Sequence, residues 1–252
     1  MRVGMIVAQG PGNGHRARCD ALRKGLLGAG HEVVGAFDAE LDWLVVDDAE
    51  YENGVHCDVF NADNVMAVYD NGCGCEFCKP TADIIIKPHE QPRLAWVADR
   101  WQGAYYYRQR EQPRLRLAYC QMGMSSEGLR MQRDIAKAFA GVDDGPQLME
   151  VAYDVCIGAP GHSSWERCAM GMPTLQIIFC ESHKLVGEAI DKADAGITVW
   201  NTLDEGPIDL DELEQRCNAV LKDIDLEQMG RNARNLCDGK GVERTIKLME
   251  VG

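Results

Sequence analysis

Two glycine-rich segments of the chain carry residues that could do chemistry, and the first surrounds His15. Gly12 and Gly14 precede this histidine just after an apolar run, so a loop here would join a strand to a helix. Glycines let a backbone approach a ligand closely, and a helix start offers free N–H groups to an anion. Imidazole transfers protons near neutral pH, so His15 is a candidate general base or water-orienting residue. A capping or packing role is the structural alternative.

The second segment spans residues 158–173 and joins another expected strand to a helix. It contains small, hydroxyl and ionisable residues, namely Gly161, His162, Ser163, Ser164 and Glu166. Hydroxyl and backbone donors at a helix start suit a diphosphate, and a carboxylate one turn later can accept both hydroxyl groups of a ribose. A serine N-cap and a glutamate that answers the helix dipole are the alternative roles, and these are compatible with ligand binding.

A third segment contains Cys73, Cys75 and Cys78. Three thiolates at this spacing could hold zinc in a closed, tetrahedral structural site. A fourth ligand would come from another cysteine or a histidine, namely Cys57, His56 or His89. Three reduced loop thiols explain the same pattern without a metal. No position suggests the open water site of a catalytic metal, so we expect catalysis to require no cofactor.

Two weaker patterns concern nucleotides and nucleic acids. Glycines at positions 10, 12 and 14 approach the dinucleotide-binding pattern, but its third glycine would fall at position 15, which is histidine. Between residues 93 and 116, six arginines stand against two acidic residues, a local charge of +4. Aromatic rings in this segment could stack on the bases of a nucleic-acid acceptor. We favour a connector whose arginines pair with an acidic surface and whose rings pack between domains.

Short apolar runs alternate with amphipathic stretches, which predicts a parallel α/β fold. Strands are expected at 3–8, 32–37, 43–46, 65–69, 84–86, 115–120, 155–158, 174–180 and 196–199. Helices are expected at 15–29, 126–140, 164–170 and 185–193, and two that begin near 209 and 227 close the chain. The aperiodic stretch 88–116 predicts a boundary between Rossmann-like domains at 1–112 and 113–252. Such domains would face each other across a cleft at their strand ends, which is the expected site.

The composition limits the partners of the protein. Its 252 residues include 40 acidic and 26 basic ones, so the net charge of −14 repels polyanions and anionic membranes. No apolar stretch has the length of a membrane helix, and the start has no signal-peptide pattern. The 11 cysteines are an odd number and lie mostly within expected elements, as small apolar residues do. We therefore expect a cytoplasmic protein with no membrane partner.

Together the motifs resemble those of a known family. Gly-x-Gly-His-x-x-Arg-Cys at 12–19 and Ser-x-Trp-Glu-Arg-Cys-x-x-Gly-x-Pro at 163–173 are similar to the UDP-sugar hydrolases of pseudaminic acid synthesis and the related spore-coat polysaccharide proteins. The strand that ends at Asp47, the next strand end at Asp70 and the connector 103–108 resemble the same family. The segment 142–152 is shorter than the strand and helix usual there.

The resemblance implies a glycosyltransferase-B-like enzyme with His15 as its catalytic histidine. Asp47 and Asp70 are further candidates at the reacting centre. Ser163, Ser164 and Glu166 would hold the nucleotide in the second domain. The remaining expected substrate-binding residues are Gly12, Gly14, Arg18, Gly123, Gly161, His162 and His183.

We therefore predict an enzyme that breaks the anomeric C–O bond of a nucleotide-sugar, expected to be UDP-linked. Transfer to an acceptor hydroxyl of a small molecule or glycan is favoured, and a modified nucleic acid is a less favoured acceptor. Hydrolysis, with water as the acceptor, is the alternative. A non-catalytic nucleotide-sugar binding protein is the second alternative. Helix-end N–H groups would stabilise the departing diphosphate without a metal.

Overall fold

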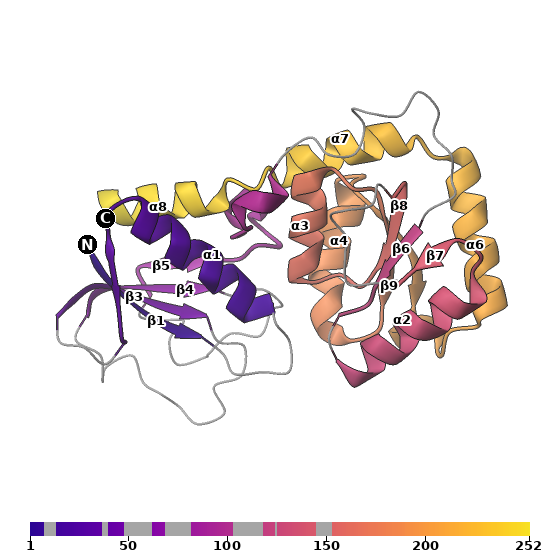
Figure 1. Ribbon diagram of the computed structural model, residues 1–252, viewed down its shortest axis with the longest axis horizontal. Helices are drawn as coiled ribbons and strands as arrows, with labels where there is room; N and C mark the ends of the chain where they lie inside the picture. Colours follow the sequence, from indigo (N-terminus) through magenta and orange to yellow (C-terminus); the bar gives the residue numbers. More distant parts are fainter. Residues whose placement is uncertain are drawn as a thin grey trace. The chain divides into compact units, whose positions relative to one another are not determined.

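The chain forms two compact units, each built on one parallel sheet (Figure 1). The computed structural model describes residues 1–7, 14–36, 40–47, 62–68, 82–102, 118–123, 125–144 and 153–252. The first unit contains residues 1–99 and 239–252, and the second contains residues 100–238. The predicted α/β class with parallel strands is confirmed.

The sheet of the first unit has five parallel strands. They are β1 (Arg2–Val7), β2 (Glu32–Val34), β3 (Leu41–Asp47), β4 (Ala62–Val68) and β5 (Ile84–Ile86). Their order is β2-β1-β3-β4-β5. Buried residues follow one another along β3 instead of alternating, as expected for a central strand covered on both faces. Because the chain passes from one side of β1 to the other between β2 and β3, the β1/β3 pair forms a topological switch point.

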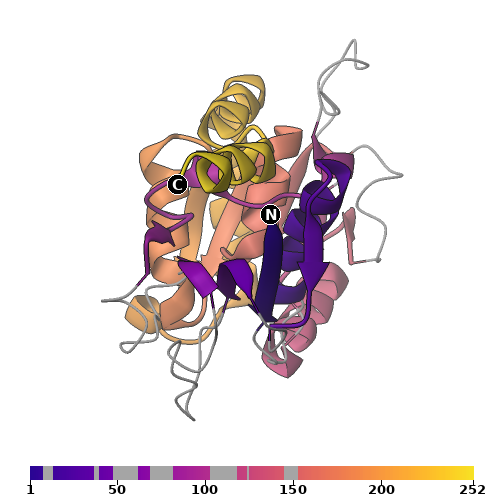
Figure 2. The ribbon, with the colours of Figure 1, turned by 90° about the vertical axis from the view of Figure 1, so that its left-hand side faces the viewer.

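Two helices pack together in the first unit, α1 (Gly14–Gly28) and α8 (Gly241–Val251). Gly25 permits their close approach, since a Cβ there would come within 2.3 Å of Val242 Cγ1. Indole N–H groups also bond α8 to the unit: Trp43 Nε1 donates to Met249 O at 3.1 Å. Both chain termini lie at the same end of this unit (Figures 1 and 2).

The sheet of the second unit repeats this topology. Its strands are β6 (Ala118–Gln121), β7 (Val142–Asp143), β8 (Val155–Gly158), β9 (Thr174–Ile178) and β10 (Ile197–Asn201). The order β10-β9-β8-β6-β7 places the first strand of the unit between the second and the third, as in the first unit. The switch point of this sheet therefore lies between β6 and β8.

The helices of the second unit mostly begin at side-chain caps. They are α2 (Ser126–Ala138), α3 (His162–Met170), α4 (Lys184–Lys192), α5 (Thr202–Glu205), α6 (Leu210–Asp223) and α7 (Leu226–Leu236). Ser125, Asp209 and Asp225 accept bonds from backbone N–H groups at the starts of α2, α6 and α7. Local capping explains why the expected starts of these helices lie close to the observed ones.

Three expectations differ from the structure. The division falls at residues 99/100 and 238/239, whereas the prediction placed one boundary at 112/113. The helices that begin near 209 and 227 were predicted to be the last elements of the chain. The structure has one more helix, α8, which belongs to the first unit. The two-residue strand β7 lies at 142–143, where no strand was expected. None of the described helices is long and apolar enough to span a membrane.

Candidate functional site

The first cluster of ionisable residues lies at the switch point of the first unit. His15 is the second residue of α1, which follows β1, and Asp47 is the last residue of β3. Val7 and Asp47 are partners in the β1/β3 register, so the start of α1 and the end of β3 meet at one sheet edge. His15 Nδ1 lies 2.9 Å from Asp47 Oδ1. Two residues 32 positions apart in sequence thus form a histidine–carboxylate pair.

Asp47 is fully buried and is held by two further residues of α1. Arg18 Nε donates to Asp47 Oδ2 at 2.6 Å, and the same guanidinium also donates to Oδ1 through Nη2. The thiol of Cys19 donates to Oδ2 at 3.1 Å. Only His15 of this cluster reaches solvent, with 19% of its side chain exposed against 3% for Arg18 and none for Asp47.

Asp47 is ionised in this arrangement. Burial alone would raise its pKa, but the hydrogen bonds from Arg18 and His15 outweigh burial and hold the pKa below its usual range. A carboxylate only accepts, so the proton shared with His15 belongs on Nδ1; this tautomer is assigned from the hydrogen-bond network. Nε2 then carries a lone pair, which is the state required of a general base.

The second cluster lies at the switch point of the second unit, where α3 follows β8. Ser164 is buried, and its Oγ accepts from the backbone N–H of Gly161 at 3.2 Å and from Arg167 Nη2 at 2.8 Å. Ser163 Oγ accepts from Arg167 Nη1 at 3.3 Å. In this bond the Ser163 oxygen is the acceptor. The hydroxyl proton takes no part in it and can be donated to a ligand. Ser164 is the N3 residue of α3 and accepts from the N-cap residue Gly161, so Ser163 is the better ligand-binding candidate.

Arg167 connects α3 to the neighbouring strand end. It is 1% exposed, and its guanidinium donates to Gln121 Oε1 at 2.8 Å and to Ala159 O at 2.9 Å. Gln121 and Gly158 are register partners at the ends of β6 and β8. A Cβ at Gly158 would lie 3.0 Å from Arg167 Cζ, so the guanidinium packs directly on the end of β8. Sequence reasoning gave Arg167 and Gln121 no role, although Arg167 belongs to the second motif.

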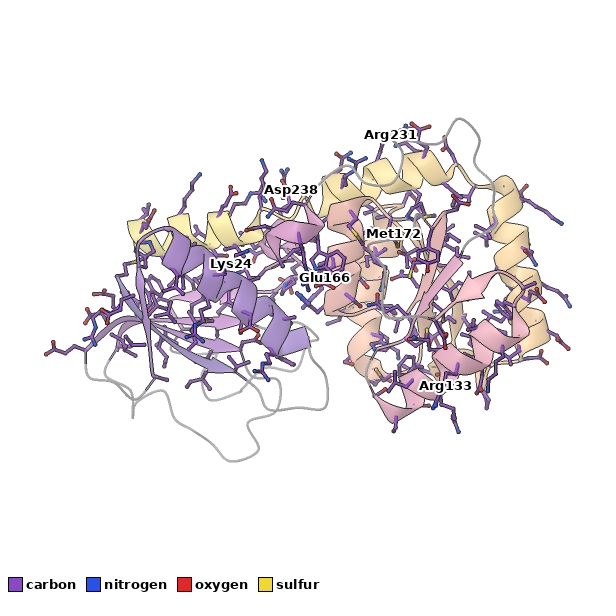
Figure 3. All side chains as sticks on the ribbon, viewed as in Figure 1. Lys24, Arg133, Glu166, Met172, Arg231 and Asp238 are labelled. Atoms are coloured by element: carbon purple, nitrogen blue, oxygen red, sulfur yellow. The ribbon has the colours of Figure 1, made fainter. Side chains whose placement is uncertain are left out.

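Three other predicted ligand residues are partly or largely buried around α3. Burial raises the pKa of Glu166, and this effect outweighs the charges of Arg167 and Arg100, which lower it. Nε2 of His162 lies 3.8 Å from a carboxylate oxygen of Glu166. Burial and then the charge of Arg167 lower the pKa of His183 to about 4, so this imidazole is neutral near pH 7. Glu166 is marked on α3 in Figure 3.

The remaining predicted residues have separate locations. Gly123 is exposed after β6 with φ +86°, and Gly14 begins α1. Several predicted residues lie outside the described ones, namely Gly12, Asp70, Cys73, Cys75 and Cys78. Within the described ranges, no group of three or more His, Cys, Asp or Glu side chains is arranged to hold a metal ion. The zinc hypothesis therefore stays a prediction.

No protein-family model and no curated protein matches the chain. Solved structures of glycosyltransferases do match. The spinosyn rhamnosyltransferase SpnG, complexed with spinosyn aglycone, is 13% identical over 98% of this chain and 100% of its own, with a TM-score of 0.57. The spinosyn forosaminyltransferase SpnP is 14% identical over 99% of both chains, with a TM-score of 0.56. SnogD from Streptomyces nogalater is 12% identical over 99% of both chains, with a TM-score of 0.55.

The chain has a glycosyltransferase fold. At these identities the similarity shows the fold alone, and it agrees with the glycosyltransferase-B-like architecture expected from the motifs. The finer resemblance, to UDP-sugar hydrolases of pseudaminic acid synthesis, stays a prediction.

Proposed function

We propose that this protein is a nucleotide-sugar-dependent glycosyltransferase in which His15 is the general base. The observation that carries the proposal is the His15–Asp47 pair at the β1/β3 switch point, with a partly exposed imidazole on a buried carboxylate. Ligands of open parallel sheets bind outside the carboxyl ends of the strands at such a point. The glycosyltransferase fold supports this class of reaction.

In the proposed reaction, Nε2 of His15 takes the proton of an acceptor hydroxyl. The acceptor oxygen forms a bond to the anomeric carbon as the bond from that carbon to the diphosphate oxygen breaks. The nucleoside diphosphate leaves with the electron pair of that bond, and His15 becomes an imidazolium. Asp47 stabilises this cation, since it is ionised and accepts from Nδ1. The proposal includes no cofactor.

The second unit would hold the nucleotide. The start of α3 offers backbone N–H groups and the Ser163 hydroxyl to the diphosphate, and Glu166 would accept from the ribose hydroxyls. We propose a UDP-sugar donor, with a thymidine-linked donor as its competitor, because structures of SpnG and of SsfS6 from Streptomyces sp. SF2575 hold thymidine diphosphate. The acceptor is proposed to be a small molecule or glycan, and the spinosyn aglycone bound to SpnG supports a small molecule.

The reduced thiols fit a reducing compartment, and we propose a cytoplasmic location. The seven cysteines among the described residues are thiols and not disulfides, and six of them are buried. Such thiols persist where glutathione and thioredoxin keep them reduced.

The deciding experiment measures nucleoside diphosphate release from UDP- and dTDP-sugars, with and without candidate acceptors. Strictly acceptor-dependent release supports transfer, whereas release in water alone makes the protein a hydrolase. His15→Asn should lower turnover by ~10²–10⁴-fold, the contribution of general-base catalysis.

His31→Asn is the matched control. His31 follows the other end of α1 and also faces a carboxylate, with Nε2 3.1 Å from Glu250 Oε1. This variant should keep wild-type turnover. A folded His15→Asn enzyme with near wild-type turnover removes His15 from the mechanism, and binding without any turnover leaves only a nucleotide-sugar binding protein.

A further inference from the structure

One face of α1 supplies every hydrogen bond that Asp47 receives from the side chains of described residues. His15, Arg18 and Cys19 stand at positions i, i+3 and i+4, which share one helix face. Asp47 Oδ2 accepts from Arg18 Nε and the Cys19 thiol, while Oδ1 accepts from Arg18 Nη2 and faces His15 Nδ1. Arg18 thus touches both oxygens and fixes the plane of the carboxylate.

The position of Arg18 does not suit direct substrate binding, the role expected from its motif. Its side chain is 3% exposed, and its guanidinium engages Asp47 with two nitrogens. Arginine stays protonated in proteins and has no acceptor, so its charge is permanent. Arg18 therefore acts on the pair beside it.

We propose that Arg18 is a positioning residue that selects the reactive tautomer of His15. It keeps Asp47 a carboxylate with Oδ1 turned to the imidazole, so the proton stays on Nδ1 and Nε2 is free to act as a base. The expected effect of Arg18 on activity rests on the proposed function, but the tautomer of His15 is a property of the free protein.

Removal of Arg18 has a definite chemical consequence. A buried carboxylate without its cation favours the protonated form. A carboxylic acid at Asp47 would donate to Nδ1 instead of accepting from it, and the imidazole proton would move to Nε2. Cys19 cannot replace Arg18, because burial, followed by the charge of Asp47, raises the pKa of its thiol and leaves a weak neutral donor. His15 would then face the acceptor hydroxyl with an N–H.

The geometry also permits the other tautomer of His15, so a measurement of the tautomer can contradict the proposal. Arg18 Nη2 lies 2.9 Å from His15 Nδ1, so an unprotonated Nδ1 could accept from Arg18. That state would leave Asp47 Oδ1 facing a lone pair at 2.9 Å. We expect the Nδ1–H state because it forms a charge-assisted hydrogen bond to a carboxylate that can only accept.

The test combines ¹⁵N NMR of histidine-labelled protein with steady-state kinetics. In the free wild-type protein near pH 8, His15 should show Nδ1–H and an unprotonated Nε2. Arg18→Gln should shift His15 toward the Nε2–H tautomer, lower kcat by ~10–100-fold and change the KM for the donor by less than about threefold. Arg23→Gln, an exposed arginine on the same helix, should change none of these.

Two further variants keep the test decisive if Arg18→Gln does not fold. Arg18→Lys retains the cation and should restore the Nδ1–H tautomer. Asp47→Asn presents an amide that can donate, and it should give the Nε2–H tautomer even with Arg18 present. An Nε2–H tautomer in the wild type, or an unchanged Nδ1–H tautomer in folded Arg18→Gln, overturns the inference. A tautomer that depends on Arg18 in a protein without glycosyl transfer supports the inference and removes only the proposed function.

Discussion

Arg18 and Arg167 occupy complementary places in the two units but have different partners. Arg18 lies on the helix after the first strand of its sheet and reaches the end of the third, at Asp47. Arg167 lies on the helix after the third strand of its sheet and reaches the end of the first, at Gln121. Each buried guanidinium therefore links its helix to the end of the strand on the other side of the switch point.

The two arginines differ in the charge of their hydrogen-bond partners. Arg18 is paired with a carboxylate, whereas the hydrogen bonds of Arg167 go to neutral oxygens of Gln121, Ser163, Ser164 and Ala159. The charge of Arg167 extends to its surroundings, where it contributes to the low pKa of His183. The charge of Arg18 is balanced by Asp47, and this pair can support His15 as a base. The charge of Arg167 is not balanced by its hydrogen-bond partners, so it leaves a positive potential that suits the proposed diphosphate.

The largest effect should come from breaking the charged pair of the first unit. Asp47→Ala removes the carboxylate that the buried guanidinium of Arg18 contacts through two nitrogens, and it should lower the free energy of unfolding by about 3–5 kcal/mol. Chemical denaturation measures this loss. Asp42→Ala, an exposed carboxylate on the same strand, is the control and should cost much less. Adding Arg18→Met to Asp47→Ala should recover part of the stability, and no recovery would contradict the charge argument.

The two units should also differ in their response to acid. His183 has a pKa lowered from 6.5 to about 4, so the folded state binds its proton less readily than the unfolded state does. The contribution of His183 to the stability of the second unit should therefore fall as the pH drops from 6.5 to about 4, by about 3 kcal/mol at most. The pKa of Asp47 is lowered from its ordinary value, so its contribution is present above about pH 4 and is lost only below it.

Hydrogen exchange of peptides from β8 and β9 against peptides from β3, measured between pH 7 and 4, separates the two responses. His183→Phe should remove the part of the slope that comes from this imidazole, whereas the raised pKa of Glu166 contributes with the opposite sign in both proteins. Equal loss of protection in both units of the wild type would show that the two clusters do not differ in this way.

The smallest effect should come from Arg167→Met. This change removes the charged donor of Gln121 Oε1 and one of the two donors of Ala159 O, and the loss of these charge-assisted hydrogen bonds should cost about 1–3 kcal/mol. Arg231→Met is the control, because Arg231 points into solvent from α7 (Figure 3). NMR titration should also show a rise in the pKa of His183 when Arg167 is replaced. A loss as large as that of Asp47→Ala would show that neutral partners matter as much as the carboxylate.

The sequence by itself determined most of the elements and their order, although not β7 or α8. Strands β5 and β8 were predicted with the bounds that the structure has, because short β-branched or apolar runs between turn residues are local signals. The first turn of α1 was found from its glycines and His15, and the start of α2 was predicted at residue 126, where the structure has it. Each of these signals lies within a few residues of the element that it defines.

Only the tertiary structure decided which side chains meet. Arg18 and Asp47 are 29 positions apart, and their contact depends on β3 pairing with β1, which the pattern of apolar residues along either strand does not specify. For the same reason the motif indicated Arg18 as a ligand-binding residue, and the fold placed it beneath His15. The return of α8 to the first unit likewise required packing against Trp43, 206 positions from Met249. The periodicity of apolar residues predicts which face of an element is buried. Strand order and helix packing determine which side chains meet, and these depend on the burial of apolar surface over the whole chain.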